Sequence, residues 1–237
     1  MTDLSVVCWR WKPAPGYRSV YPPSTVNTLK RMVARNYQRP HRFICVTDDA
    51  TGLDADVEVV PLWPDHADLA SPHGARSPSC YRRLRAFAPD AGQFFGPRFV
   101  SIDLDCVITG DVTPVWDRPE DAVFWGGTHP TTAYNGSMVL LTAGARPQVW
   151  ERFDPATSPA AARLAGCYGS DQGWISHCLG PAEAKWTRAD GIYSLRNDLR
   201  RSQHLPVDAR IVMFHGRRDP WQRDVQREFP WIGRFYR

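Results

Sequence analysis

The sequence predicts an α/β fold built on a mixed, mainly parallel sheet. Short apolar runs rich in β-branched residues alternate along the chain with segments of helical periodicity. This alternation is typical of βα units that place successive strands parallel in one sheet. The 237 residues fit one large domain, and no internal repeat or long linker divides them. We therefore expect residues 1–237 to form a single domain.

Four strands and two helices are expected in the first half of the chain. A helix is predicted from Ser24, as its N-cap, to about residue 34, and a second helix over 81–87. Loops are expected at 13–16, where Pro and Gly cluster, and over the polar residues 63–79. The strands are the apolar runs 4–9, 43–47, 57–62 and 99–105.

The second half continues the alternation with three strands and two helices. Apolar runs predict strands at 122–125, 137–141 and 211–214. Helices are expected over about 145–154 and 170–179. Ligands of such sheets bind beyond the carboxyl ends of the strands. Because we expect Cys8, Asp48 and Asp103 to lie at these ends, the sequence predicts one crevice there.

The most informative motif is the pair Asp103 and Asp105 at the end of an apolar run. Residues two apart on a strand share a face, so both carboxylates should point the same way. Two like charges at one place require neutralisation, and carboxylate oxygens suit Mg²⁺ or Mn²⁺. The pair therefore predicts a divalent-metal site for a phosphorylated substrate. The alternative is an ordinary turn, since Gly110 and Asp111 follow closely.

A second candidate group follows the last predicted strand, at His215, Gly216, Arg217 and Arg218. Neutral imidazole is a ligand for Mn²⁺, glycine permits close approach, and arginine pairs with phosphate. The alternative is a histidine that only packs in the core. The carboxylate pair elsewhere in the chain favours the ligand interpretation.

Three further motifs have both structural and functional interpretations. Asn135 could simply shape a turn, and Ser170 or Asp171 could cap the helix that begins there. The functional alternative is that Asp171 and Gln172 contact sugar hydroxyls. Arg83 lies in a cationic segment that is either solvated or able to reach a diphosphate.

Composition excludes several classes of partner. The net charge is only +4, with 26 arginines and three lysines and no dense basic run, so nucleic-acid binding is not indicated. The six cysteines form no Cys-x-x-Cys pair, and three of them lie in apolar runs. No basic, apolar leader begins the sequence, and no segment approaches the ~18 apolar residues of a membrane span. We expect a cytoplasmic protein without a membrane span.

Six short motifs occur in an order found in a known group of enzymes. They are Thr47-Asp48-Asp49, Tyr81-Arg82-Arg83-Leu84, Ser101-Ile102-Asp103-Leu104-Asp105, Asn135-Gly136-Ser137, Ser170-Asp171-Gln172 and Phe214-His215-Gly216. On these motifs the chain resembles small bacterial glycosyltransferases of the GT-A fold, related to glycosyltransferase family 8 and its uncharacterised bacterial relatives. The similarity covers nearly the whole chain. It implies a single GT-A domain that uses a nucleotide-sugar donor.

The resemblance also implies roles for the metal-binding and catalytic residues. Asp103 and Asp105 would form the DxD motif that holds Mn²⁺ (or Mg²⁺) against the donor diphosphate, and His215 would be the third protein ligand. Asp171 would accept hydroxyls of the donor sugar, and Gln172 would lie beside the anomeric carbon. Retention of anomeric configuration is expected, with attack on the same face as the leaving group.

Donor-binding roles follow from the same resemblance. Asp48 or Asp49 would lie near the nucleobase and ribose, and Cys8 would contact the nucleotide through its backbone. Asn135 and Gly216 occupy further donor-binding positions, and Arg83 stands where the pattern usually has lysine. One departure concerns Asp219, which stands where the pattern commonly has a lysine before proline. Arg217 and Arg218 would supply the missing positive charge. The favoured donor is a UDP-sugar, and the acceptor is not identified.

Two alternatives come from other functional classes. The run into Asp103-Leu104-Asp105 also resembles the first motif of haloacid-dehalogenase-type phosphatases, in which the first aspartate is the nucleophile. That family places the motif near its N-terminus and needs a later lysine and acidic pair, whereas here only Lys185 follows and no Asp-Asp does. The second alternative is a sugar-nucleotide-binding protein without catalytic activity.

Overall fold

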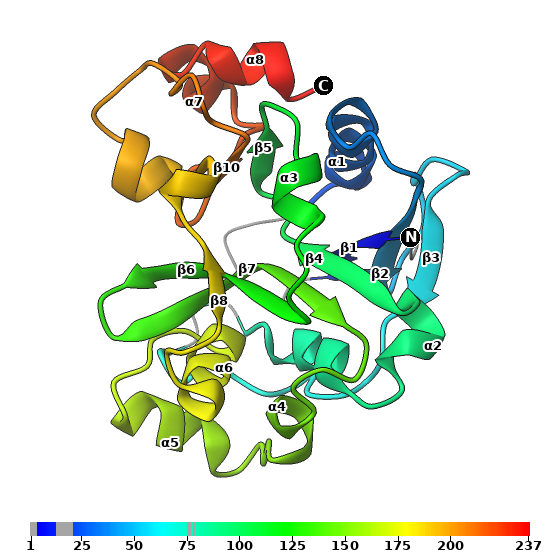
Figure 1. The fold of residues 1–237 in the computed structure, drawn as a ribbon, viewed down its shortest axis with the longest axis vertical. Helices are drawn as coiled ribbons and strands as arrows, with labels where there is room; N and C mark the ends of the chain where they lie inside the picture. Colours follow the sequence, from blue (N-terminus) through cyan, green and yellow to red (C-terminus); the bar gives the residue numbers. More distant parts are fainter. Residues whose placement is uncertain (1–3, 13–20, 75–76, 78) are drawn as a thin grey trace.

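The computed structural model describes residues 4–12, 21–74, 77 and 79–237. The loop expected at 13–16 lies outside these residues. Within them the chain is an α/β molecule in which helices cover both faces of a central sheet (Figure 1). None of its described helices is long and apolar enough to cross a bilayer.

Seven of the described strands form the central sheet, in the order β3-β2-β1-β4-β7-β6-β8. Strands β3, β2, β1 and β4 are mutually parallel, and β8 is parallel to β6. Strand β7 runs antiparallel to both of its neighbours, β4 and β6. The predicted mixed, mainly parallel sheet is confirmed. The bounds are β1 Leu4–Arg10, β2 His41–Thr47, β3 Glu58–Pro61, β4 Arg98–Ile102, β6 Ala122–His129, β7 Thr132–Thr142 and β8 Ala184–Trp186.

One face of the sheet is covered by the 3₁₀-helix η1 and by the helices of the middle of the chain. Buried apolar side chains of η1, α2, α4 and α6 pack with the sheet residues Phe99 and Phe124. In Figure 1 this layer lies below the sheet. The segment 81–87, expected as a helix, is 3₁₀ rather than α. The elements are η1 Tyr81–Phe87, α2 Ala91–Phe95, α4 Gln148–Glu151, α5 Ser158–Leu164 and α6 Asp171–Leu179.

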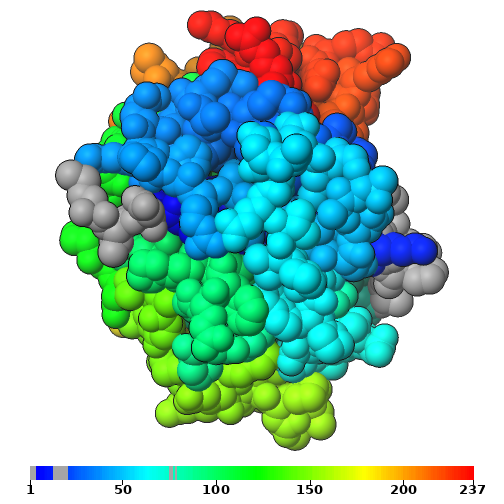
Figure 2. Space-filling view, turned by 90° about the vertical axis from the view of Figure 1, so that its right-hand side faces the viewer, coloured from blue at the N-terminus to red at the C-terminus, as the bar shows by residue number. Residues whose placement is uncertain are grey.

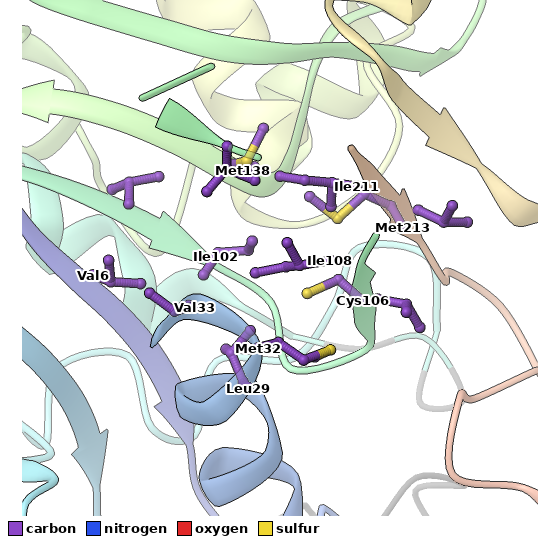
Figure 3. Packing of buried hydrophobic residues seen from close by; sticks show 14 of the residues in the cluster. Val6, Leu29, Met32, Val33, Ile102, Cys106, Ile108, Met138, Ile211 and Met213 are labelled. Atoms are coloured by element: carbon purple, nitrogen blue, oxygen red, sulfur yellow. The ribbon is translucent and has the colours of Figure 1, made fainter. Parts of the chain in front are cut away.

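The opposite face carries helix α1 and a second, three-stranded sheet. Val6, Ile102 and Met138 of the large sheet contact the apolar side of α1 and the small sheet in one buried cluster (Figure 3). In the small sheet β10 lies between antiparallel β5 and parallel β9. The elements here are α1 Pro23–Asn36, β5 Cys106–Ile108, α3 Thr113–Trp116, η2 Arg188–Asp190, β9 Ile192–Ser194, the π-helix η3 Leu195–Leu199 and β10 Ile211–Met213.

The C-terminal helices α7 Arg223–Glu228 and α8 Trp231–Phe235 complete this layer. Ile232 and Phe229 are fully buried in the cluster around α1 and the small sheet. Arg35 of α1 donates hydrogen bonds to the carbonyl oxygens of Phe235 and Arg237, at 2.9 and 2.6 Å. The space-filling view shows the C-terminal segment beside the N-terminal helix at one end of the molecule (Figure 2).

The structure corrects several boundaries predicted from sequence. Ser24 is not the N-cap of α1, because the helix begins at Pro23, whose fixed φ suits the first turn, and Pro22 precedes it. Cys8 is not at a strand end, because β1 continues to Arg10. The helix expected over 145–154 is reduced to α4, and α5 was not predicted. The last strand, β10, belongs to the small sheet rather than the large one.

The motif Asp103-Leu104-Asp105 connects the two sheets. Strand β4 of the large sheet ends at Ile102, and β5 of the small sheet starts at Cys106. The Asp103 amide donates to the carbonyl of Ser137 in β7 at 2.8 Å, and the Phe214 amide donates to the Asp105 carbonyl at 2.8 Å. The two aspartates therefore lie in a turn beyond the strand. The strand that was expected to carry them ends before Asp103, so strand alternation does not apply to this pair.

Candidate active site

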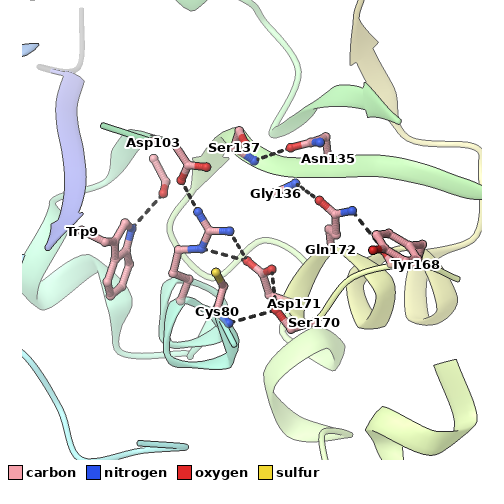
Figure 4. A network of polar contacts seen from close by, with 12 residues as sticks. Trp9, Cys80, Asp103, Asn135, Gly136, Ser137, Tyr168, Ser170, Asp171 and Gln172 are labelled. Atoms are coloured by element: carbon pink, nitrogen blue, oxygen red, sulfur yellow. Dashed lines mark hydrogen bonds and ion pairs between the residues drawn. The ribbon is translucent and has the colours of Figure 1, made fainter. Parts of the chain in front are cut away.

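The centre of the candidate site is an arginine shared by two carboxylates. Arg83 of η1 forms ion pairs with Asp103, just after β4, and with Asp171, the first residue of α6 (Figure 4). Its Nε lies 2.9 Å and its Nη2 2.7 Å from Oδ2 of Asp171. Only 11% of the Arg83 side chain and 5% of the Asp171 side chain are exposed. The expectation that the cations of η1 form a solvated face is therefore wrong for Arg83.

Burial and charge oppose each other within this triad. Burial would lower the pKa of Arg83, but Asp103 and Asp171 outweigh it and raise that pKa well above its usual value. The pKa of Asp171 is nevertheless raised, because its burial and the negative charge of Asp103 outweigh the attraction of Arg83. One guanidinium thus neutralises two carboxylates incompletely. The site keeps an excess of negative charge that an incoming hydroxyl donor or cation would relieve.

Helix α6 delivers Gln172 beside this triad. Its side-chain oxygen accepts from the Gly136 amide at 3.4 Å, and its amide nitrogen donates to the Tyr168 carbonyl at 3.1 Å. A Cβ on Gly136 would lie 2.9 Å from Oδ2 of Asp171 and 3.0 Å from Nη2 of Arg83. Glycine at this position therefore lets strand β7 approach the ion pair closely.

Asn135 and the residues at the start of α6 do not have the purely structural roles that the sequence allowed for them. Asn135 is buried inside β7 rather than in a turn before it, and its side chain accepts from the Ser137 amide at 2.9 Å and donates to Thr128. Neither Ser170 nor Asp171 caps α6 with its side chain. The Ser170 hydroxyl instead accepts from the Cys80 amide at 2.9 Å. Ser170 and Asp171, for which capping was the structural interpretation, instead belong to the network around Arg83.

Asp105 lies buried where the chain enters the small sheet. Burial, followed by the charges of Asp103 and Asp219, raises the pKa of Asp105 well above its usual value. Asp219, the residue that replaces the expected lysine, is itself buried and accepts from Gln222 at 3.2 Å. This concentration of carboxylates is costly without a compensating cation.

His215 follows β10 and is held by the neighbouring strand. Its Nε2 lies 2.6 Å from the hydroxyl of Ser194, at the end of β9, and its ring meets Trp125 edge-on at 5.9 Å. Burial, followed by the positive charge of Arg196, lowers the pKa of His215 to about 4. The imidazole is therefore neutral at pH 7, the state that metal binding requires.

The predicted metal ligands fit a divalent cation in chemistry but are not assembled around one point. The described part of the chain contains no ready group of three Asp, Glu, His or Cys side chains placed to hold a metal ion. Asp103 is paired with Arg83, and His215 with Ser194. The buried carboxylate of Asp105, on which the negative charges of Asp103 and Asp219 act, is nevertheless a group that a hard cation such as Mn²⁺ or Mg²⁺ would stabilise.

The residues expected near the nucleotide belong to β1 and to the segment that follows the carboxyl end of β2. Asp48 directly follows β2 and accepts from the Lys12 amide at 3.1 and 3.3 Å. The Asp49 carbonyl accepts from Arg10 at 2.7 Å, and its carboxylate accepts from the Thr51 amide. The Cys8 side chain is fully buried in the core beside Cys45, so only its backbone is available to a ligand.

The segment after β10 lines a pocket of about 370 Å³. His215, Gly216, Arg217 and Arg218 form one part of its lining. Arg218 pairs with Glu228 at 2.7 Å and lies over the Phe229 ring. The Arg217 side chain is exposed. The negative charge of Asp103, a member of the Arg83 triad, acts to raise the pKa of His215 in this lining.

An aromatic stack beside Gln172 was not predicted from sequence. The Tyr168 ring stacks on His129 with the ring centroids 5.0 Å apart, and it meets His73 at 4.4 Å with a tilt of 36°. It is 46% exposed. The Gly169 amide donates to Nε2 of His73 at 3.0 Å, and the Tyr168 amide donates to the Thr132 hydroxyl at 2.7 Å. These contacts tie the loop before α6 to the β6–β7 hairpin. Because its members are far apart in sequence, no local pattern indicates the stack.

Solved structures that match this architecture include several glycosyltransferases. The galactosyltransferase LgtC, solved with donor and acceptor sugar analogues, matches with a TM-score of 0.62 at 14% identity, over 98% of this chain and 96% of LgtC. GlyE of Streptococcus pneumoniae TIGR4 matches with a TM-score of 0.60 at 11% identity, over 97% of this chain and 61% of GlyE. Mouse xyloside xylosyltransferase 1 matches with a TM-score of 0.55 at 11% identity, over 90% of this chain and 97% of that protein.

The chain has the GT-A fold. The α/β fold class expected from the sequence is confirmed, and the phosphatase hypothesis is not favoured, because these neighbours are glycosyltransferases. No protein-family model and no curated protein matches the sequence. At identities of 11–14% the structural matches establish the architecture, and the chemistry has to be argued from the site.

Proposed function

We propose that this protein is a glycosyltransferase that takes a sugar from a nucleoside diphosphate, with a UDP-sugar as the favoured donor. The observation that carries the proposal is the sharing of Arg83 between Asp103 and Asp171, beside Gln172, in a GT-A fold. This arrangement puts carboxylate, guanidinium and amide groups at the carboxyl edge of the sheet, where α/β folds bind ligands.

We propose that the reaction depends on a divalent cation, Mn²⁺ or Mg²⁺. Asp103, Asp105 and His215 would hold it. When bound, the cation would stabilise negative charge on the departing diphosphate. The neutral imidazole of His215 and the excess carboxylate charge around Asp105 support this assignment.

The chain's own residues orient the sugar. Asp171 would accept hydrogen bonds from donor-sugar hydroxyls, and Gln172 would lie beside the anomeric carbon. In the transfer, the bond from the anomeric carbon to the diphosphate oxygen breaks and its electron pair leaves with the diphosphate. The acceptor oxygen forms the new bond from the same face, which retains configuration, and its proton passes to the departing diphosphate.

The nucleotide would extend towards the carboxyl ends of β1 and β2. Asp48 or Asp49 would contact the ribose and base, and the backbone of Cys8 would contribute a further contact. Asn135 would support the donor from β7. Gly216, Arg217 and Arg218 would face the diphosphate from the segment after β10.

Hydrolysis of the donor in the absence of acceptor tests the reaction class. With Mn²⁺ we expect slow release of UDP from one member of a panel of UDP-sugars, and much less in EDTA. Nuclear magnetic resonance of the released sugar would report retention. Phosphate release from simple phosphomonoesters, with an aspartyl-phosphate on Asp103, would favour the phosphatase instead. Metal-dependent UDP binding without hydrolysis would favour the non-catalytic alternative.

Gly136→Ala tests the placement of the Arg83 triad without removing a charge. The added methyl would displace Asp171 or Arg83, because both lie within about 3 Å of its position. A misplacement of about 1 Å near a reaction centre lowers the rate by about a hundredfold. We expect donor hydrolysis to fall at least tenfold in a protein that stays folded, with a loss of stability of about 1–3 kcal/mol from overpacking. Gly233→Ala, whose Cβ meets nothing within 4 Å, is the matched control, and equal rates in both variants would contradict the assignment.

A further inference from the structure

The pocket beside His215 has a second wall that the proposed donor site does not use. Strands β9 and β10 are parallel neighbours, so the segments that follow them lie side by side. The segment after β9 contributes Leu195, Arg196 and Arg200, and the segment after β10 contributes residues 215–218. The hydrogen bond between Ser194 and His215, 2.6 Å long, joins the two walls at their base. The pocket of about 370 Å³ is of the size of small-ligand sites.

The pocket has a strong excess of positive charge. Four arginines line it, and Arg218 alone among them forms an ion pair, with Glu228, in the part of the chain that the structure describes. The one acidic residue of η3, Asp198, is engaged elsewhere: it accepts from the Ser194 amide at 2.8 Å and lies 3.7 Å from Arg188. These arginines are exposed at the rim of one pocket. Guanidinium groups gathered in this way favour an anion, and phosphate is the anion that their planar fork matches best.

We propose that Arg196 and Arg200 bind a phosphate group carried by the acceptor. This inference rests on the proposed glycosyltransferase function and names the class of its acceptor. The wall of residues 215–218 is assigned to the donor diphosphate, and the donor site already contains Arg83 and the proposed cation. Arg196 and Arg200 line the same pocket from the neighbouring segment after β9, within reach of a ligand bound beside the donor. A phosphate-bearing sugar or lipid-linked glycan supplies that charge.

Calorimetric titration of glucose 1-phosphate and of glucose, into protein saturated with UDP and Mn²⁺, tests the proposal. We expect the phosphate to bind and glucose not to, with an affinity that weakens as salt is raised. The double variant Arg196→Gln/Arg200→Gln should lose about tenfold or more of the affinity for glucose 1-phosphate, because charge-assisted hydrogen bonds are lost. Its affinity for UDP should stay within about twofold, since neither arginine is assigned to the donor. Arg201→Gln, an exposed neighbour outside the pocket lining, is the control for the loss of one positive charge.

Three results would overturn this assignment. In the first, UDP prevents glucose 1-phosphate from binding, or the double variant loses UDP affinity to the same degree, which would assign both arginines to the donor. In the second, Arg201→Gln weakens binding as much as the double variant, which would reduce the effect to general charge. In the third, neither glucose 1-phosphate nor pyrophosphate binds in the low millimolar range. Failure of the proposed function would appear differently, as absence of UDP binding in the wild-type protein, and the phosphate titration without UDP would still report on the pocket.

Discussion

At Arg83 a single buried cation is shared by two carboxylates from distant parts of the chain. Asp103 comes from the end of β4, and Asp171 from the start of α6. Removing a cation from a buried pair leaves uncompensated negative charge, and this is far more costly than loss of an exposed pair. The residue therefore has a structural role in addition to the one proposed in donor binding.

Arg83→Gln should lower the free energy of unfolding by about 3 kcal/mol. Arg42→Gln, which breaks the exposed pair with Glu58, should cost less than about 1 kcal/mol. The double variant Arg83→Gln/Asp171→Asn should recover part of the loss, because it removes one unpaired carboxylate. Urea unfolding of the three variants measures these differences. Equal costs for Arg83→Gln and Arg42→Gln would contradict a buried, shared cation.

Among the elements, the hairpin of β6 and β7 depends on a close backbone approach. The strands lose regular register between Gly126 and His129. A Cβ on Gly127 would lie only 1.7 Å from the carbonyl oxygen of Thr132, so no other residue fits there without moving the backbone. The tip of the hairpin also contacts the loop before α6 through Thr132 and Tyr168.

Gly127→Ala should therefore destabilise the protein by about 1–3 kcal/mol through overpacking. We also expect weaker stacking of Tyr168 on His129, because the hairpin tip must move. Denaturant midpoints and the near-ultraviolet circular dichroism of tyrosine measure the two effects. Gly233→Ala serves again as the control, since its methyl group has open space. An unchanged midpoint for Gly127→Ala would show that the hairpin adapts without strain.

At the scale of the whole molecule, two hydrophobic cores lie on opposite faces of one sheet. Strand β4 contributes Phe99 to one core and Val100 and Ile102 to the other. The C-terminal helix α8 belongs to the core around α1, through Ile232. Because the cores share strands, they should unfold together.

Ile232→Ala should lower the free energy of unfolding by about 2–5 kcal/mol, the usual cost of a large-to-small change in a core. The variant should still unfold in a single transition. Trp174, in the other core, should report the same midpoint as the far-ultraviolet circular dichroism. Two separate transitions would contradict the prediction from sequence that residues 1–237 form one domain.

Strands were the part of the fold most readable from sequence. The apolar runs in β1, β2 and β4 are buried on both faces, and such burial produces a local signal. The ion pair of Arg83 with Asp171 joins residues 88 positions apart, and no local pattern encodes it. The prediction that Asp103 and Asp105 lie on the strand was wrong, because periodicity cannot indicate that a strand stops at Ile102.

The three residues Asp103-Leu104-Asp105 are a short connection between the large sheet and the small sheet, which lie in different layers of the fold. The small sheet also carries His215 after β10 and Arg196 after β9. Any sliding of the small sheet against the large one would change the separation of the two aspartates before it changed either sheet internally. The separation of the two aspartates would then report how far the two sheets have moved relative to each other. A ligand bound to residues of both sheets would hold the sheets in one relative position.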